Sequence, residues 1–195
     1  MSRKTEATRT HILEVAMAML KESRGRGVRM ADIARQAKVS RQAIYLHFSS
    51  RAELMDATTR FLDQKLELDS RLTPSRTAAT GKARLSAYIA FWGEYLPEMY
   101  STAKAMLLLK ESDEAAAAAW RDRMAALREG CEAAILALHS DNQLTEQWSC
   151  DTATDLLWTL LSVPNWENLT GECGWSNQEY IDRIKQVAEQ VLLRP

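Results

Sequence analysis

The stretch KVSRQAIYLHFSSR, from Lys38 to Arg51, concentrates side chains that can bind a nucleic acid. Arg41 and Gln42 stand in the first turn of a predicted helix. An arginine suits the O6 and N7 acceptors of guanine, and a glutamine suits the N6/N7 edge of adenine. We therefore expect Arg41 and Gln42 to read bases in the major groove of DNA.

Three further side chains of this stretch are suited to phosphate. Tyr45 and His47 lie in the second turn and Arg51 lies just beyond the helix; such groups hold a protein in position on DNA without reading its sequence. Two alternatives stay open: Tyr45 as a surface aromatic residue, and His47 as a histidine hydrogen-bonded within its own domain. Ser40 precedes the helix and is expected to cap its first turn.

The residues around this stretch predict the helices that position it. Apolar residues at spacings of three and four predict a first helix over residues 4–22 and a second over residues 30–37. A three-residue turn then leads into the helix after Ser40. Two short helices joined in this way form a helix-turn-helix, whose second helix enters the major groove. A fourth helix is predicted to open near Ser50, with Glu53 as its capping-box partner.

The rest of the chain also predicts helices, and the expected fold class is therefore all-α. Residues 73–81, rich in Pro, Ser, Thr and Gly, predict the boundary between two parts of the chain. Pro97 is expected to begin a helix and Pro164 to kink one. Five helices are predicted after the boundary, over residues 82–96, 97–111, 113–139, 147–169 and 177–193.

The charges are distributed unevenly between these parts. Residues 1–60 contain 12 Lys and Arg against 6 Asp and Glu, whereas residues 61–195 contain 13 against 20. A basic segment followed by an acidic one indicates that the first meets a polyanion, although chance variation in solvated charge is the alternative. We expect residues 1–60 to form a three-helix DNA-binding domain with the helix-turn-helix, and residues 61–195 to form a helical ligand-binding and dimerisation domain.

Composition and motifs argue against several other classes of protein. Cys131, Cys150 and Cys173 are too few and too far apart for a disulfide framework or a zinc pattern. The N-terminus lacks the apolar core of a signal peptide, and no run of about 18 apolar residues occurs, so we expect a cytoplasmic protein. Glycine-rich phosphate loops, nucleophile elbows and HExxH motifs are missing. We expect no cofactor, no metal site and no enzymatic activity.

Residues 10–61 resemble the DNA-binding domain of the TetR family of transcriptional repressors. The segments HILEVAMAML, VRMADIARQAKVSRQAIYLHF and SSRAEL stand in the family's order and spacing. The resemblance implies a homodimer whose C-terminal domain binds a small effector and whose last two long helices pair the subunits. The match to the family pattern includes Ile33, Ala34, Val39, Ser40, Tyr45, His47, Phe48 and Leu54.

Two departures from the family pattern bear on DNA binding. Met30 stands where the family commonly has a threonine that contacts phosphate, so this contact is lost or passes to Arg29. Lys38 stands where the turn usually has glycine. A left-handed backbone at Lys38 would cost about 1 kcal/mol, and its ammonium group could then lie near phosphate.

Aromatic and methionine side chains mark the helices on which the resemblance places an effector. Core packing is the first interpretation for any one of them. As a set they would suit a flat, apolar or cationic molecule, because ring faces attract cations, and Glu94, Glu98 and Asp155 could supply charge. The candidate effector residues are Trp92, Tyr95, Met99, Tyr100, Met106, Trp120, Met124 and Trp158.

The sequence thus predicts a ligand-responsive transcriptional regulator, expected to be a repressor, that binds a palindromic DNA operator as a homodimer and is released by a small effector. The alternative is a helical DNA-binding protein whose second domain binds a protein partner and which has no small-molecule effector. A third interpretation, an all-α enzyme, lacks a catalytic constellation.

Overall fold

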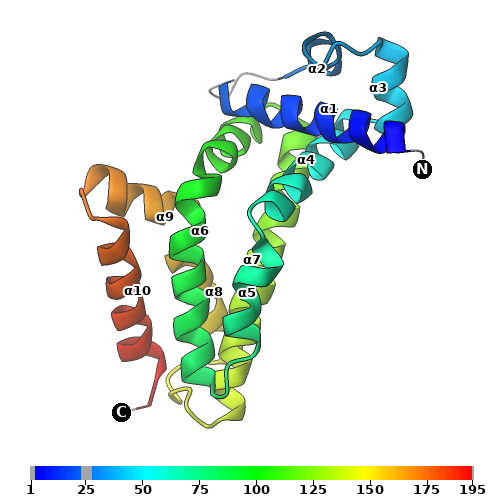
Figure 1. Cartoon of the computed structure of the whole chain (residues 1–195). Coiled ribbons are helices and arrows are strands. Elements are labelled where there is room, and N and C mark those ends of the chain that lie inside the picture. Colours follow the sequence, from blue (N-terminus) through cyan, green and yellow to red (C-terminus); the bar gives the residue numbers. More distant parts are fainter. Residues whose placement is uncertain (1–2, 23–27, 195) are drawn as a thin grey trace. The chain divides into compact units, whose positions relative to one another are not determined.

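The computed structural model describes residues 3–22 and 28–194, and within these ranges the chain is helical and has no β-strand (Figure 1). This confirms the all-α fold class. The elements are α1 (Arg3–Glu22), α2 (Met30–Gln36), α3 (Arg41–His47), α4 (Arg51–Lys65), α5 (Leu68–Arg76), α6 (Gly81–Leu109), α7 (Glu114–Ser140), α8 (Cys150–Leu160), α9 (Val163–Glu167), the π-helical η1 (Asn168–Glu172) and α10 (Asn177–Leu192).

The chain divides into two compact units, each made of two separate parts of the sequence. The first unit comprises the residues up to Leu66 together with Met99–Arg123, and the second unit comprises Glu67–Glu98 and Met124–Pro195. Helices α6 and α7 therefore each contribute to both units. The boundary at residue 60 between a DNA-binding and an effector-binding domain stays a prediction.

The first four helices pack around a common apolar core in the first unit. Helix α1 packs against α2 and α4, and α2 packs against α3, its neighbour in Figure 1. Ile12 of α1, Ile44 of α3 and Leu54 of α4 are completely buried. The two short helices α2 and α3 confirm the predicted helix-turn-helix.

The turn between α2 and α3 is built around Lys38, whose φ is 55°. The amide of Lys38 donates to the carbonyl of Arg35 at 3.2 Å, and the amide of Val39 donates to the carbonyl of Ala34 at 3.0 Å. These two bonds form the Schellman arrangement of a helix C-terminus, which needs a left-handed residue at this position. The left-handed backbone considered for Lys38 is thus confirmed.

Serine hydroxyls cap α3 and α4 at their N-termini, as predicted. The Oγ of Ser40 accepts from the amide of Ala43 at 3.0 Å, and the Oγ of Ser50 accepts from the amide of Glu53 at 3.1 Å. The predicted capping box is wrong in one detail. The Glu53 carboxylate accepts from the amide and hydroxyl of Ser49, at 2.8 and 2.6 Å, instead of from Ser50. Ser49 offers two donors to the charged group, and this pair of bonds lowers the pKa of Glu53.

Pro97 lies inside α6 and does not begin a new helix, contrary to the prediction. A proline in a helix leaves the carbonyl four residues earlier without its usual donor, and here that carbonyl belongs to Gly93. The side-chain Nδ2 of Asn177, at the start of α10, donates to the Gly93 carbonyl at 2.9 Å. Because a neighbouring helix supplies the missing donor, the helix can continue past Pro97.

At Pro164, unlike at Pro97, the predicted helix is interrupted. The helix predicted over residues 147–169 is divided into α8, α9 and η1, and the chain breaks before Ser162 instead of kinking. Ser162 caps α9, and Pro164 lies in the first turn of α9, where an amide donor is not needed. The carbonyl of Leu160, four residues before Pro164, accepts from the hydroxyl of Tyr180 at 3.0 Å.

The boundary predicted over residues 73–81 is largely helical. Helix α5 extends to Arg76, and four residues separate it from α6. The hydroxyl of Ser75 is buried and donates to the carbonyl of Arg84 at 3.2 Å. The polar side chains that predict a loop in the sequence instead form hydrogen bonds within α5 and between α5 and α6.

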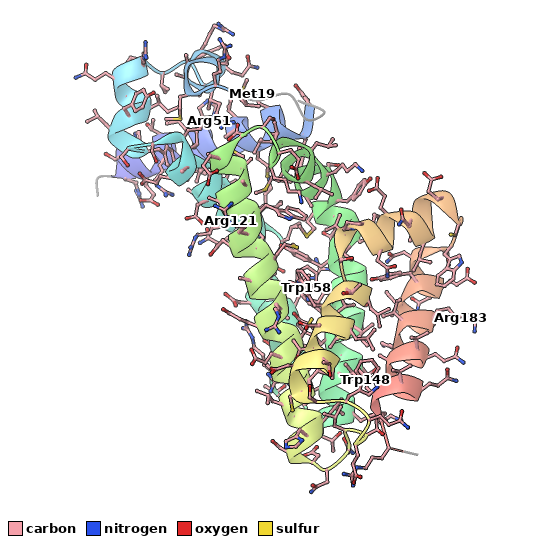
Figure 2. All side chains as sticks on the ribbon, turned by 180° about the vertical axis from the view of Figure 1, so that it is seen from behind. Met19, Arg51, Arg121, Trp148, Trp158 and Arg183 are labelled. Atoms are coloured by element: carbon pink, nitrogen blue, oxygen red, sulfur yellow. The ribbon has the colours of Figure 1, made fainter. Side chains whose placement is uncertain are left out.

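The core of the second unit contains the last helix, which lies where it was predicted. Tyr180, Ile181 and Ile184 form its buried stripe, and α10 packs against α8. A Cβ atom at Gly93 would lie 2.2 Å from Cγ1 of Ile181, so α6 and α10 approach each other closely (Figure 1). Arg183 lies on the opposite, exposed side of α10 (Figure 2).

Replacing Lys38 by glycine tests the left-handed turn. We expect Lys38→Gly to be about 0.5–1 kcal/mol more stable than Lys38→Ala, because glycine adopts a positive φ without steric strain whereas alanine keeps the Cβ. Urea denaturation of the two variants measures the difference. Equal stability of the glycine and alanine variants would contradict a strained turn.

Candidate nucleic-acid interface

The exposed face of α3 follows from the residues that the helix buries. Ile44 and Phe48, four residues apart, are 0% exposed and hold one side of the segment against the core. With 3.6 residues per turn, the residues between them must point elsewhere. Arg41, Gln42 and Tyr45 are exposed, so three of the predicted DNA contacts share one accessible surface of the first unit.

The turn before α3 adds two of the predicted contacts. Lys38 and Ser40 are exposed, and the left-handed backbone leaves the Lys38 side chain outside the core. The Ser40 oxygen is engaged in capping α3, which leaves its hydroxyl proton available to a phosphate oxygen. His47 is half-buried at the end of α3, with its ring centroid 6.4 Å from that of Phe48. The DNA roles of these residues stay predictions.

The start of α2 shows what Met30 does in place of the family's threonine. The Met30 side chain is buried in the core of the first unit, and Arg29, the N-cap residue, makes no side-chain capping bond. The Arg29 side chain is exposed. Met30 thus adds apolar burial at the first residue of α2, and the exposed Arg29 stays the predicted phosphate contact.

Arg51 lies in a different environment from the arginine of α3. Its Nε donates to the carbonyl of Val28 at 2.7 Å, and its Nη1 forms an ion pair with Asp113 (Figure 2). Its Nη2 is buried without a hydrogen-bond partner among the described residues. Arg51 therefore connects the start of α4 to the segment before α2 and to the start of α7, and the structure does not bring it to the exposed face of α3.

Asp113 both caps α7 and holds Arg51. One of its oxygens accepts from the amide of Ala116 at 3.1 Å, while the other pairs with Arg51. Burial alone would raise the pKa of Asp113, but the hydrogen bonds from Arg51 and Ala116 outweigh it and lower this pKa from its ordinary value of 3.8. Nearby, Arg123 makes a second link between α7 and α4, with its Nη2 2.7 Å from the carboxylate of Asp63.

Two residues of the first unit were missed by the sequence reasoning. Leu46, in the second turn of α3, is 80% exposed, and an apolar residue on a DNA-reading helix gives no polar signal. A count of helical positions from Ile44 would have found it. The guanidinium of Arg9, on α1, lies over the Phe48 ring at 4.9 Å from its centroid, a contact between distant segments that spacing does not reveal.

A polar groove of about 310 Å³ lies between α1 and α4 in the first unit. Charges of both signs line it, among them Arg9, Glu53 and Arg60. None of the predicted DNA-binding or effector-binding residues lines this groove. It therefore does not help to locate either predicted site.

The candidate effector residues are divided between the two units. Trp92, Tyr95, Met124 and Trp158 belong to the second unit, and Met99, Tyr100, Met106 and Trp120 belong to the first. Five of the eight are buried, namely Trp92, Tyr95, Met99, Met106 and Trp120, and the other three, Tyr100, Met124 and Trp158, are partly buried. Burial alone agrees with the core interpretation as well as with an effector site.

An aromatic cluster on α6 forms the centre of the second unit's candidate site. Phe91 and Tyr95 stack with their ring centroids 5.3 Å apart, and the Trp92 ring meets the edges of both. Tyr88 joins the cluster, and its hydroxyl donates to the carbonyl of Leu127 at 3.0 Å. The guanidinium of Arg71 lies over the Tyr95 ring, 5.4 Å from its centroid, so this cluster already attracts one cation.

Two buried indole groups in the second unit are without hydrogen-bond partners in the described part of the chain. They are the Nε1 atom of Trp92 on α6 and that of Trp158 on α8; Trp158 is labelled in Figure 2. A buried donor without an acceptor costs about 1–3 kcal/mol, so such groups are rare in filled cores. A ligand that carries an acceptor atom would satisfy them.

The acidic residues considered as partners of a cationic effector are already occupied or exposed. Glu98 pairs with Arg71 at 2.6 Å, and Asp155 pairs with Arg128 at 2.9 Å. Glu94 is exposed. The aromatic rings, and not these carboxylates, are therefore the groups that could attract a cation in this region.

Other chemistry finds little support among the described residues. Burial raises the pKa of the Cys131 thiol to about 12, so this thiol stays protonated and unreactive at neutral pH. Over residues 3–22 and 28–194, the His, Cys, Asp and Glu side chains form no group of three or more that could hold a metal ion. The same ranges contain no helix with the length and apolarity needed to cross a membrane.

The charge of Asp113 can be removed without removing the cap. We expect Asp113→Asn to lower stability by about 1–2 kcal/mol at pH 7, because asparagine still caps a helix but cannot pair with Arg51. The folded protein has the lower Asp113 pKa, so this contribution is present above the ordinary pKa and is lost as the pH falls through the folded-state pKa. The difference in stability should therefore shrink on acidification from pH 7 to below 4, as measured by thermal unfolding.

Asp56→Asn is the matched control, because Asp56 pairs with Arg60 on the exposed side of α4. Exposed pairs of this kind contribute less than about 1 kcal/mol. A loss of stability for Asp113→Asn no larger than that for Asp56→Asn would show that the Arg51 pair is not important for the first unit.

Comparison with known proteins agrees with the helix-turn-helix. The family model described as bacterial regulatory proteins, tetR family, matches residues 12–58. The nucleoid occlusion factor SlmA of Marinomonas sp. (strain MWYL1) is 36% identical over 66 residues. These residues are 34% of this chain and 34% of that protein, so the match spans about a third of the relative's length.

Solved structures extend the similarity to the whole chain. A putative transcriptional regulator from Saccharomonospora viridis, in complex with choline, has a TM-score of 0.75 at 19% identity over 97% of this chain and 100% of that one. NalD of Pseudomonas aeruginosa, the secondary repressor of the MexAB-OprM multidrug efflux pump, has a TM-score of 0.71 at 20% identity over 98% of both chains. At these identities the likeness shows the fold. Residues 12–58 therefore match the DNA-binding domain of the tetR family of bacterial regulatory proteins, and the chain shares its fold with proteins described as transcriptional regulators.

Proposed function

We propose that this protein is a homodimeric transcriptional repressor that binds a palindromic DNA operator and is released by a small effector. The observation that carries the proposal is the exposed face of α3, where Arg41, Gln42 and Tyr45 are accessible within a helix-turn-helix that matches the TetR family model. In such a motif the second helix enters the major groove. The similar proteins are described as regulators, and we propose a binding role in the cytoplasm without catalysis.

We assign some residues of the first unit to contacts with bases and others to contacts with phosphates. Arg41 and Gln42 would read base edges in the major groove. Tyr45 would hold phosphate through its hydroxyl, together with the other predicted contacts. Those other contacts are Arg29, Lys38, Ser40, His47 and Arg51, of which Arg51 would have to give up part of its pairing with Asp113.

A palindromic operator requires two copies of α3. Reading adjacent major grooves on one face of the duplex calls for a separation of about 34–36 Å between them. Helices α8 and α10, which lie in the last two of the predicted helices, pack against each other, and Val187 on the outer side of α10 is 40% exposed. Exposed apolar residues next to a packed helix pair support dimerisation through α8 and α10 as a four-helix bundle.

The effector would be a small molecule with a cationic or apolar aromatic character. The aromatic cluster around Trp92 and Tyr95 supports this choice, because ring faces attract cations. A similar fold has been solved with choline, a quaternary ammonium compound. The unpaired indole N–H groups of Trp92 and Trp158 could also donate to an oxygen acceptor of a ligand. Such an effector must prefer the DNA-free state by a few kcal/mol to change occupancy strongly.

The DNA-binding roles can be separated by sequence preference and salt dependence. Against a duplex selected from a random library, Gln42→Ala should lower the preference for the selected sequence over unrelated duplexes, because a bidentate base contact contributes about 1–3 kcal/mol of discrimination. Lys38→Ala should weaken binding to all duplexes alike and reduce the salt slope by about one. Fluorescence anisotropy over a salt series measures both. A protein that binds no duplex at 50 mM salt would refute the proposal.

The effector role can be tested with choline as the first probe. We expect choline to release the operator duplex from the wild-type protein, and Trp92→Phe to shift the midpoint to higher choline concentration, because the indole is the strongest cation–π partner. Trp148→Phe is the control, since Trp148 lies outside the candidate site, in the segment between α7 and α8. Release by neither choline nor larger aromatic cations would favour the alternative, a second unit that binds a protein partner.

A further inference from the structure

Leu46 presents the most exposed large apolar side chain among the described residues. It is 80% exposed, whereas Tyr45, Leu108, Leu136 and Val187 are between 40% and 48% exposed. Leucine on the surface of a globular protein is not unusual in itself. Its position is unusual, because it lies in the second turn of the helix whose other exposed residues are polar and suited to DNA.

The position of Leu46 around α3 can be derived from the buried residue Ile44. Successive residues of a helix are separated by about 100°, so Gln42 and Leu46 each lie about 160° from Ile44, on either side of the point directly opposite the core. By the same geometry Arg41 lies about 60° and Tyr45 about 100° from Ile44. The centre of the exposed face therefore belongs to Gln42 and Leu46, with Arg41 and Tyr45 along one edge.

A residue at the centre of this face meets the base edges if α3 lies in the major groove, and the long side chain of Arg41 can reach them from the first turn of the helix. Leucine has no donor or acceptor, so the chemistry available to it is apolar contact. The only apolar group that base pairs present in the major groove is the C5-methyl group of thymine. Gln42, one turn before Leu46 on the same face, suits the adenine edge, and the two side chains together fit a step that contains A·T pairs.

We propose that Leu46 is a specificity-determining residue that contacts the C5-methyl group of a thymine in each operator half-site. The inference rests on the proposed DNA-binding function and adds a residue and a base feature to it. Burial of one methyl group against Leu46 corresponds to about a fourfold gain in affinity. The contact discriminates against any base that lacks the methyl group.

Removing the methyl group of one thymine at a time tests this contact directly. A fluorescein-labelled duplex is selected from a random-sequence library with the wild-type protein, and each thymine is then replaced singly by deoxyuridine, which removes only the methyl group. We expect one thymine per half-site whose replacement weakens wild-type binding about three- to fivefold, measured by anisotropy at fixed salt. Leu46→Ala should bind the unmodified duplex more weakly and be indifferent to that replacement.

Two controls accompany this double comparison. Leu108→Ala removes another exposed leucine of the first unit, on α6, and should respond to deoxyuridine as the wild type does. Cytosine placed at the sensitive position should weaken wild-type binding, and 5-methylcytosine should recover part of the loss. Circular dichroism of Leu46→Ala should match the wild type, because the side chain is exposed and supports no core.

The outcomes separate this inference from the function on which it rests. A wild-type protein that binds a selected duplex but ignores every deoxyuridine would overturn the Leu46 contact and leave the DNA-binding function intact. Equal sensitivity of Leu46→Ala and wild type at the same thymine would also overturn it. If no duplex binds at 50 mM salt, the proposed function and the Leu46 contact both fail.

Discussion

The burial of Ile44 and Phe48 sets the rotation of α3, and every proposed base contact depends on that rotation. Both side chains are fully enclosed, so turning the helix would expose large apolar groups to water, at about 1.5–3 kcal/mol for each. The Schellman turn at Lys38 and the Ser40 cap determine where α3 begins. Together these local features direct Gln42 and Leu46 outward.

The arginines of the first unit show that a hydrogen-bonding or ion-pair partner determines whether a guanidinium group is free to contact DNA. Arg41 lies exposed on α3, whereas Arg51 is drawn into an ion pair with Asp113 and a hydrogen bond to Val28. The partner Asp113 comes from the segment Met99–Arg123, which belongs to the same compact unit as α3. That segment also contains candidate effector residues, so a ligand touching them would act within the unit that is proposed to bind DNA.

Pro97 and Pro164 of the second unit illustrate a similar dependence on tertiary contacts. The carbonyl four residues before each proline accepts from a side chain of α10, and the carbonyl before Pro164 also accepts from Asn165 of α9. Asn177 reaches the carbonyl of Gly93 and Tyr180 reaches that of Leu160. The helix continues through Pro97 but stops before Pro164, where Ser162 provides a cap for a new start. Helix α10 thus contacts the backbone of both α6 and α8, which carry Trp92 and Trp158.

The sequence by itself determined the all-α class, the helix-turn-helix and the caps at Ser40 and Ser50. These features depend on neighbouring residues, whose spacing and backbone preferences are visible along the chain. Only the tertiary structure decided that Lys38 adopts the left-handed conformation, that α6 passes through Pro97 and that Arg51 pairs with Asp113. These outcomes depend on donors, charges and apolar surfaces brought together from distant segments, and local periodicity carries no information about them.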